Sequence, residues 1–98
     1  MEKILSTVPS FNGKRNEMKK NDLIKETKYL KFIVTELKPK TVVVGVYNIS
    51  HNDMIAEIEW YGPWRQYCFS PGYGTVWNKQ CLMDVNDTIE LLKNDRVK

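Results

Sequence analysis

The sequence has few of the residues on which enzymes and metalloproteins commonly depend. Its 98 residues include one histidine, His51, and two cysteines, Cys68 and Cys81. Two cysteines are too few for the disulfide framework of a small secreted protein, and these two lack the close spacing of a structural zinc site. We therefore expect reduced thiols, no bound metal, no cofactor and no enzymatic activity.

Features that direct a chain to a membrane are also scarce. No apolar run approaches the roughly 20 residues of a membrane-spanning helix, and the apolar stretch near the N-terminus is too short for a signal peptide. The chain also lacks the length for a dinucleotide-binding fold, which needs repeated strand–helix–strand units. These absences predict one small cytoplasmic domain with no membrane partner.

The residues that remain for catalysis form no convincing set. Glu57 and Glu59 are two apart on a predicted strand, so their side chains share a face about 6.5–7 Å apart, a separation that superficially suits paired carboxylates. No third ligand or polar cleft accompanies them, and we interpret them as a solvated strand face. A Cys–His nucleophile pair has no supporting residue either, because His51 falls in a predicted turn. An enzyme is therefore the weakest of three hypotheses.

The charge is divided unevenly along the chain, although the net charge is only +3. Residues 1–40 hold ten basic and five acidic side chains, whereas residues 41–98 hold five and seven. We expect residues 1–28 to form a basic, partly ordered arm. Its candidate contacts are Lys14, Arg15, Lys19 and Lys20. Such an arm either keeps the chain in solution or becomes ordered on an acidic surface.

The pattern of the chain predicts an α+β fold, an antiparallel meander of four to five strands with a C-terminal helix on one face. The expected strands are 29–37, 41–49, 54–61, 64–69 and 75–77. The β-branched strand 41–49 is expected to be central, and 29–37 to offer an exposed edge for a dimer. Residues 21–28 suit a short helix at the end of the arm. The single domain then covers 29–96.

Two of these elements have predicted faces. In strand 54–61, alternation places Met54, Ala56, Ile58 and Trp60 together. In helix 78–94, which Asn78 can cap, the apolar stripe consists of Cys81, Leu82, Val85, Ile89 and Leu92. Asp84, Asp87 and Glu90 lie away from that stripe and are expected to face water.

Aromatic residues are concentrated in one part of the sequence. All three tryptophans and seven of the eleven aromatics lie between Trp60 and Trp77. A small core cannot hold all of these rings, and Trp60, Tyr67, Phe69 and Trp77 are the ones we expect inside. Residues near the predicted turns are the candidates for binding a partner: Tyr61, Trp64, Arg65 and Tyr73. Trp, Tyr and Arg dominate interface hot spots, and aromatics also stack on unpaired bases.

Two linked motifs carry a resemblance to a known family. The first has Trp60, Trp64, Arg65, Tyr67, Phe69 and Pro71 in the pattern Trp-x-x-x-Trp-Arg-x-Tyr-x-Phe-x-Pro. The second has Thr75, Val76, Trp77, Asn78, Cys81, Leu82 and Asp84. In these motifs, over roughly residues 38–96, the chain resembles a family of small bacteriophage and prophage proteins. It departs from that pattern at Ser70 and at Asp87–Thr88, where aromatics are common. The resemblance implies a phage setting and no particular activity.

These observations lead to a ranked set of functions. The first is a non-enzymatic phage protein, a monomer or homodimer in the host cytoplasm, that binds and inhibits a host factor such as a CRISPR effector or another defence nuclease. The second is a small nucleic-acid-binding module that uses the basic arm with exposed aromatics. Both depend on which aromatics between Trp60 and Trp77 are exposed.

Overall fold

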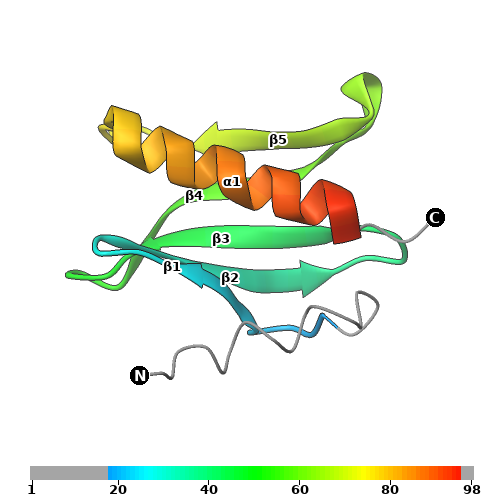
Figure 1. The fold of residues 1–98 in the computed structure, drawn as a ribbon, viewed down its shortest axis with the longest axis horizontal. Helices are drawn as coiled ribbons and strands as arrows, with labels where there is room; N and C mark the ends of the chain where they lie inside the picture. The colour runs from blue at the N-terminus through cyan, green and yellow to red at the C-terminus, as the bar shows by residue number, and fades with distance from the viewer. Residues whose placement is uncertain (1–17, 96–98) are drawn as a thin grey trace.

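The computed structural model describes residues 18–95, which form one antiparallel sheet and one long helix (Figure 1). The strands are β1 (Leu23–Glu26), β2 (Leu30–Leu37), β3 (Val42–Asn48), β4 (Asp53–Tyr61) and β5 (Gln66–Pro71), and the helix is α1 (Lys79–Asp95). Each strand pairs with the next along the chain, in the order β1-β2-β3-β4-β5, and a 3-10 turn (Gly62–Trp64) joins β4 to β5. The predicted meander with a C-terminal helix is confirmed.

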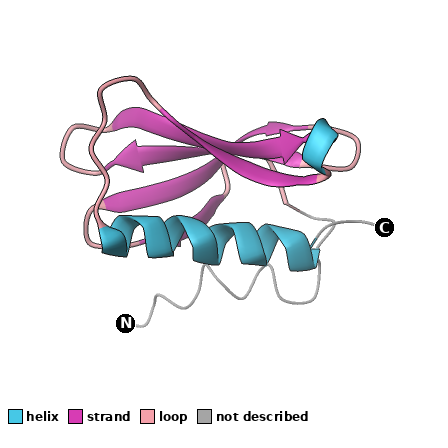
Figure 2. Cartoon of the chain, turned by 90° about the horizontal axis from the view of Figure 1, so that it is seen from above, coloured by secondary structure: helices cyan, strands magenta, loops and turns pink. Residues whose placement is uncertain are grey.

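The core lies between α1 and one face of the sheet (Figure 2). Alternate residues of each strand supply it, because side chains at i and i+2 share a face of a strand. Its most completely buried apolar side chains are Phe32, Val34, Val44, Val46, Ile58 and Leu92. The four rings expected inside also belong to it, since Tyr67 is buried and Trp60, Phe69 and Trp77 pack against the cluster.

Strand β1 corrects the prediction of a helix at 21–28. Asn21 has a left-handed backbone conformation, with φ of 76°, and its N–H donates to the carbonyl of Val34 at 2.7 Å. The backbone is thereby directed into pairing with β2 rather than into a helix. Ile24 is buried in the core, and this tertiary contact outweighs the weak helix propensity of a short polar segment. The sheet therefore begins before residue 29.

Strand β4 departs from simple alternation because it contains a bulge. The pairing with β3 shifts between Val46 and Tyr47, so Ile55 is the extra residue. As a result Ile55 packs against the core, and Met54 turns to the other face, where its Sδ lies 3.0 Å from the position that a Cβ on Gly45 would occupy. The prediction that Met54 shares a face with Ala56 and Ile58 is wrong for this reason.

The segment between β5 and α1 is a loop and not the predicted strand 75–77. The N–H and the hydroxyl of Thr75 both donate to the carbonyl of Gly72, at 3.2 and 2.8 Å. The Trp77 indole N–H donates to the Thr75 hydroxyl at 2.8 Å, and the Trp77 ring meets Phe69 edge to face at 4.9 Å. Side-chain packing and a tight turn thus replace strand pairing here.

Helix α1 begins where expected but is rotated relative to the predicted stripe. The Asn78 Oδ1 accepts the N–H of Cys81 at 2.8 Å, which is an N-cap. Asp84, expected in water, is only 7% exposed, whereas Leu82, expected in the core, is 47% exposed. The buried positions include Thr88, whose hydroxyl donates to the Asp84 carbonyl at 2.9 Å. Gln80 donates to the Asp84 carboxylate at 3.1 Å, so this buried acid has a polar partner.

No element among residues 18–95 covers the second face of the sheet (Figure 2). Glu57 and Glu59 lie half-buried on this face, as the two-residue spacing predicts, and Glu59 pairs with Lys38 at 3.3 Å. The edges of the sheet also differ from expectation. The strand containing 29–37 lies between β1 and β3 and offers no edge, so β1 and β5 are the edge strands.

Candidate binding site at the β4–β5 turn

The connection between β4 and β5 is a tight turn that holds its residues in defined positions. Pro63 lies in the first turn of the 3-10 segment, where its fixed φ suits a helical start. Arg65 ends the segment in a left-handed conformation, with φ of 55°. Its N–H donates to the carbonyl of Tyr61 at 2.9 Å and to that of Gly62 at 3.0 Å. Arg65 is therefore a turn residue and not part of the predicted strand 64–69, because β5 begins at Gln66.

Tyr61 and Trp64 form an exposed aromatic pair on this turn. Their rings meet edge to face, with centroids 5.2 Å apart and planes at 84°, a favoured arrangement of two aromatic rings. Tyr61 is 46% exposed and Trp64 is 66% exposed. We refer to residues 61–65 as the aromatic–arginine turn.

A second aromatic pair supports the turn from the core side. Trp60 and Tyr67 stand opposite each other on β4 and β5, with ring centroids 5.5 Å apart and planes at 81°. The Tyr67 hydroxyl accepts the N–H of Val42 at 3.2 Å, which ties this pair to β3. The ends of β4 and β5 that flank the turn are thus packed against the core.

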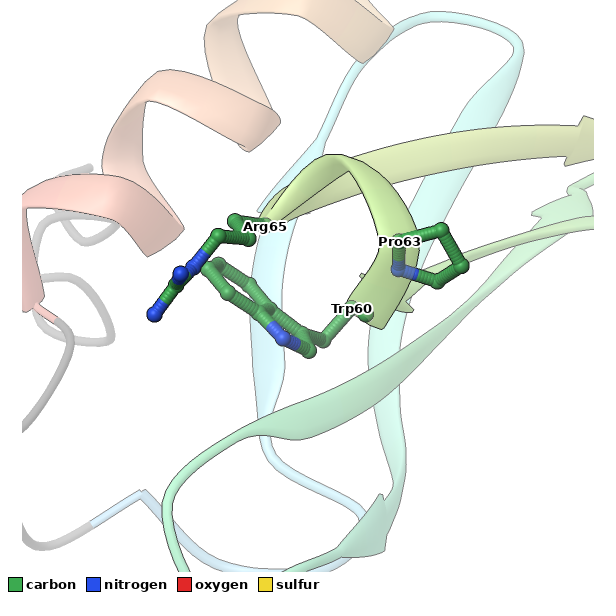
Figure 3. A pocket seen from close by; sticks show the side chains of 4 residues that line it. Trp60, Pro63 and Arg65 are labelled. Atoms are coloured by element: carbon green, nitrogen blue, oxygen red, sulfur yellow. The ribbon is translucent and has the colours of Figure 1, made fainter.

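A hollow of about 620 Å³ adjoins the turn, with Trp60, Gly62, Pro63 and Arg65 in its wall. Figure 3 shows the Arg65 side chain alongside Trp60, while Pro63 points from the opposite side of the turn. Arg65 is exposed, so its guanidinium is accessible for hydrogen bonds to an anionic or carbonyl group. The turn therefore combines exposed apolar rings with a directed cation.

The structure does not bring Tyr73 together with the other three aromatic-segment candidates. Tyr73 is fully exposed, but it follows the far end of β5. Six residues of strand separate the two positions, which corresponds to about 20 Å. Within one chain, Tyr61, Trp64 and Arg65 lie together on the turn, and Tyr73 stands apart from them.

The basic candidates are only partly within the described residues. Lys14 and Arg15 lie outside them, while Lys19 and Lys20 are exposed just before β1. The hydrogen bond from the Asn21 N–H to the Val34 carbonyl places these two lysines toward the end of the sheet where β2 finishes. The aromatic–arginine turn lies at the same end of the sheet, because β4 also finishes there. Three strand spacings, about 14 Å, separate β1 from β4.

We also searched residues 18–95 for metal ligands, reactive cysteine or histidine side chains and membrane-spanning helices. They contain no group of three or more His, Cys, Asp or Glu side chains that could hold a metal ion. Both cysteines are free and half-buried, and His51 lies exposed in the β3–β4 turn, as predicted. No helix in this part of the chain has the length and hydropathy to cross a membrane.

Sequence reasoning missed a second hollow, of about 250 Å³, at the N-terminal end of α1. Its wall is formed by Tyr29, Leu30, Asn48, Ile55, Val76, Trp77, Asn78 and Cys81. These residues come from four separate segments, and the bulge at Ile55 is needed to assemble them. The apolar pair Val76–Trp77 is the one sequence signal that points to this hollow, and the structure leaves Val76 exposed.

Comparison with known proteins adds no relative to these observations: no protein-family model, no curated protein and no solved structure matches the chain.

Proposed function

We propose that this chain is a non-enzymatic binding protein that attaches to a partner macromolecule through the aromatic–arginine turn. The observation that carries the proposal is the position of Trp64, which is 66% exposed on a turn whose backbone is fixed by hydrogen bonds and whose flanking strands carry a packed aromatic pair. A tryptophan in water contributes nothing to the core, whereas burying it against a partner removes a large apolar area from water.

Two properties of the turn suit it to binding. Its backbone is already ordered, so association costs less conformational entropy than an unstructured loop would lose. Its residue types, Trp, Tyr and Arg, are those enriched in interface hot spots, where a few side chains supply most of the binding energy. Arg65 adds direction, because a guanidinium matches carboxylate or phosphate oxygens in two hydrogen bonds.

The partner we propose is a host defence nuclease, such as a CRISPR effector, whose activity the bound protein blocks. This choice follows from the resemblance of the two sequence motifs to small phage proteins. A chain of 98 residues suits inhibition by covering a surface, since a specific interface needs only about 800 Å² from each partner.

The test is inhibition of purified effector nucleases by the wild-type chain and by Trp64→Ala. We expect the variant to need about 30-fold or more protein for half-inhibition, which corresponds to the ~2 kcal/mol of a hot spot. Leu82→Ala is the matched control, since Leu82 is also half-exposed but lies on α1, and it should inhibit like wild type. Equal inhibition by all three proteins, or none by wild type across effector classes, contradicts the proposal.

A second candidate function, nucleic-acid binding, is favoured by one observation. Lys19, Lys20 and Arg65 are exposed toward the same end of the sheet as Trp64. A phosphate backbone across this end would meet cations at two places and an aromatic ring on which a base can stack.

Salt dependence distinguishes this candidate from the first. Binding of a fluorescent single-stranded oligonucleotide should weaken steeply with salt, because each phosphate contact releases counterions. Lys19→Ala and Lys20→Ala together should reduce that dependence. Absence of binding in low salt, or binding that is insensitive to salt, removes nucleic acid as the partner.

A further inference from the structure

The outer edge of β5 has backbone groups directed away from the sheet. The N–H of Gly72 donates to the carbonyl of Ile55 at 2.8 Å, and the β4–β5 register continues without a shift from this position. In an antiparallel pair, residues bonded to the neighbour alternate with residues that face outward. Ser70 and Cys68 therefore bond to β4, and the N–H and C=O of Phe69 point to the outer edge, as does the carbonyl of Pro71.

The two edges of the sheet are protected to different degrees. The β1 edge has four residues, a register shift between Leu23 and Lys25, and two charged side chains. Such features keep other strands from pairing with an edge. The β5 edge has six residues, Gln-Tyr-Cys-Phe-Ser-Pro, with no charge and no register shift. In Figure 1, β5 forms the upper margin of the sheet with no strand beyond it.

We propose that the protein forms a two-fold symmetric homodimer in which β5 pairs antiparallel with β5 of a second copy, centred on Cys68. In this register Phe69 stands opposite Tyr67 of the second copy. The Phe69 N–H donates to the backbone carbonyl of that Tyr67, and a carbonyl oxygen can accept two hydrogen bonds. Pro71, which has no N–H to donate, then lies at the end of the pairing, opposite Arg65 of the second copy.

The same register completes the candidate binding site. Arg65 stands opposite Pro71 of the second copy, so each aromatic–arginine turn lies beside the loop that carries Tyr73 of the other copy. Tyr73, which is about 20 Å from the turn in its own chain, thereby joins Tyr61, Trp64 and Arg65 across the interface. This part of the inference rests on the proposed function, whereas the dimer does not.

A two-fold axis makes the interface self-complementary, because each contact occurs twice with the roles exchanged. The chain meets this condition: Trp64 precedes Cys68 by four residues and Gly72, which leads into Tyr73, follows it by four. The exposed aromatic at one end of β5, Trp64, is thus brought toward the exposed aromatic beyond the other end, Tyr73, of the second copy. The continuous sheet would contain the five strands of each copy, with both helices on one face.

Cross-linking through Cys68 tests the register directly. In the proposed dimer the two Cys68 residues are directly opposite without hydrogen bonds between them, so their Cα atoms are about 4.5 Å apart, within the range of about 4.4–6.8 Å that a disulfide needs. Diamide should oxidise the two thiols to a disulfide and is itself reduced to the hydrazine. We expect a covalent dimer from wild type and from Cys81→Ser, and none from Cys68→Ser.

Sedimentation equilibrium supplies a test that does not depend on oxidation. Wild type should sediment at twice the chain mass of 11.5 kDa. Cys68→Lys should weaken the dimer by about tenfold or more, because like charges would face each other across the axis. His51→Lys, which adds the same charge in the β3–β4 turn, should leave the dimer intact. Circular dichroism checks that each variant is folded.

The outcomes separate the two proposals. A wild-type monomer at high concentration, or cross-linking through Cys81 alone, overturns the dimer whatever Trp64→Ala does to inhibition. A dimer together with full inhibition by Trp64→Ala overturns the proposed function and leaves the dimer standing. Tyr73→Ala should reduce inhibition as Cys68→Lys does; unchanged inhibition by Tyr73→Ala, alongside a loss with Trp64→Ala, overturns the composite site.

Discussion

Individual residues determine several features of side-chain packing that the order of the strands alone does not determine. Gly45 is the clearest case, because it lies in the central strand β3 where Thr35, Tyr47 and Met54 close over it. A Cβ at this position would lie 2.8 Å from Thr35 Cγ2 and 3.0 Å from both Met54 Sδ and Tyr47 Cε1. Those distances are too short for unshifted side chains, so the space above Gly45 is already filled.

We therefore expect Gly45→Ala to destabilise the protein by about 1–3 kcal/mol, the usual cost of overpacking. The loss should exceed the gain of about 0.5–1 kcal/mol that alanine gives over glycine in a strand. Adding Thr35→Ser removes the closest methyl group and should recover part of the stability. Urea unfolding of the three proteins measures this, and a Gly45→Ala variant at least as stable as wild type contradicts it.

The residues hardest to anticipate from the sequence are those with unusual backbone conformations. Asn21, Asn52 and Arg65 have positive φ, and nothing in the sequence distinguishes Arg65 from a strand residue. Gly62 and Pro63 correctly predicted a turn, and the structure shows that Tyr61 and Trp64 beside it are exposed, which the sequence left open. The sequence placed Arg65 in strand 64–69, whereas hydrogen bonds from its N–H to the carbonyls of Tyr61 and Gly62 hold it in the turn.

At the scale of elements, α1 shows why a stripe of apolar residues locates a helix better than it orients one. The stripe and the Asn78 cap predicted where the helix runs. They did not predict its rotation, because Thr88 and Asp84 are buried through hydrogen bonds that a count of apolar residues ignores. Two leucines on the same helix therefore have different environments, and this gives a direct comparison.

We expect Leu92→Ala to destabilise the protein by about 2–5 kcal/mol, because Leu92 is 2% exposed and its removal leaves a cavity. Leu82→Ala should stay within about 0.5 kcal/mol of wild type, as surface changes usually do. Denaturant midpoints of the two variants, compared with wild type, decide this. Similar losses for both would mean that α1 is oriented as the apolar stripe predicted.

The start of α1 gives a second prediction at this scale. Asn78→Ala removes the acceptor of the Cys81 N–H, and we expect a loss of about 1 kcal/mol, typical of N-cap residues. Asn86→Ala is the control within the same helix, where Asn86 is exposed. It should be neutral or stabilising, because alanine has the higher helix propensity. An equal loss in both variants would contradict the role of Asn78 as a cap.

For the whole molecule, the sequence was sufficient for the order of strands and insufficient for their edges. Short turns between β-rich segments predicted the meander, because consecutive strands joined by such turns pair with each other. Which strand lay at the edge depended on residues 21–28, and four of these became β1 through pairing with β2. This error removed 29–37 from the edge of the sheet, and the absence of the predicted strand 75–77 left β5 at the opposite edge.

The dimer proposal makes a prediction about thermal unfolding. If two folded chains associate, the midpoint temperature rises with protein concentration, because mass action favours the dimer over unfolded monomers. We expect this rise for wild type and for His51→Lys, and a lower midpoint for Cys68→Lys at each concentration. Midpoints from circular dichroism over a wide range of concentrations test it. A wild-type midpoint independent of concentration would contradict the dimer.

The sequential strand order has a consequence for how the chain folds. Because every strand pairs with its neighbour along the chain, most contacts are short in sequence, and such topologies fold faster than those built on distant pairings. Strands can be added one hairpin at a time as the chain leaves the ribosome. Helix α1 comes last and closes the core, so until it is synthesised Phe32 and Ile58 lack their cover. The interval before α1 is complete is when a nascent chain would depend most on chaperones.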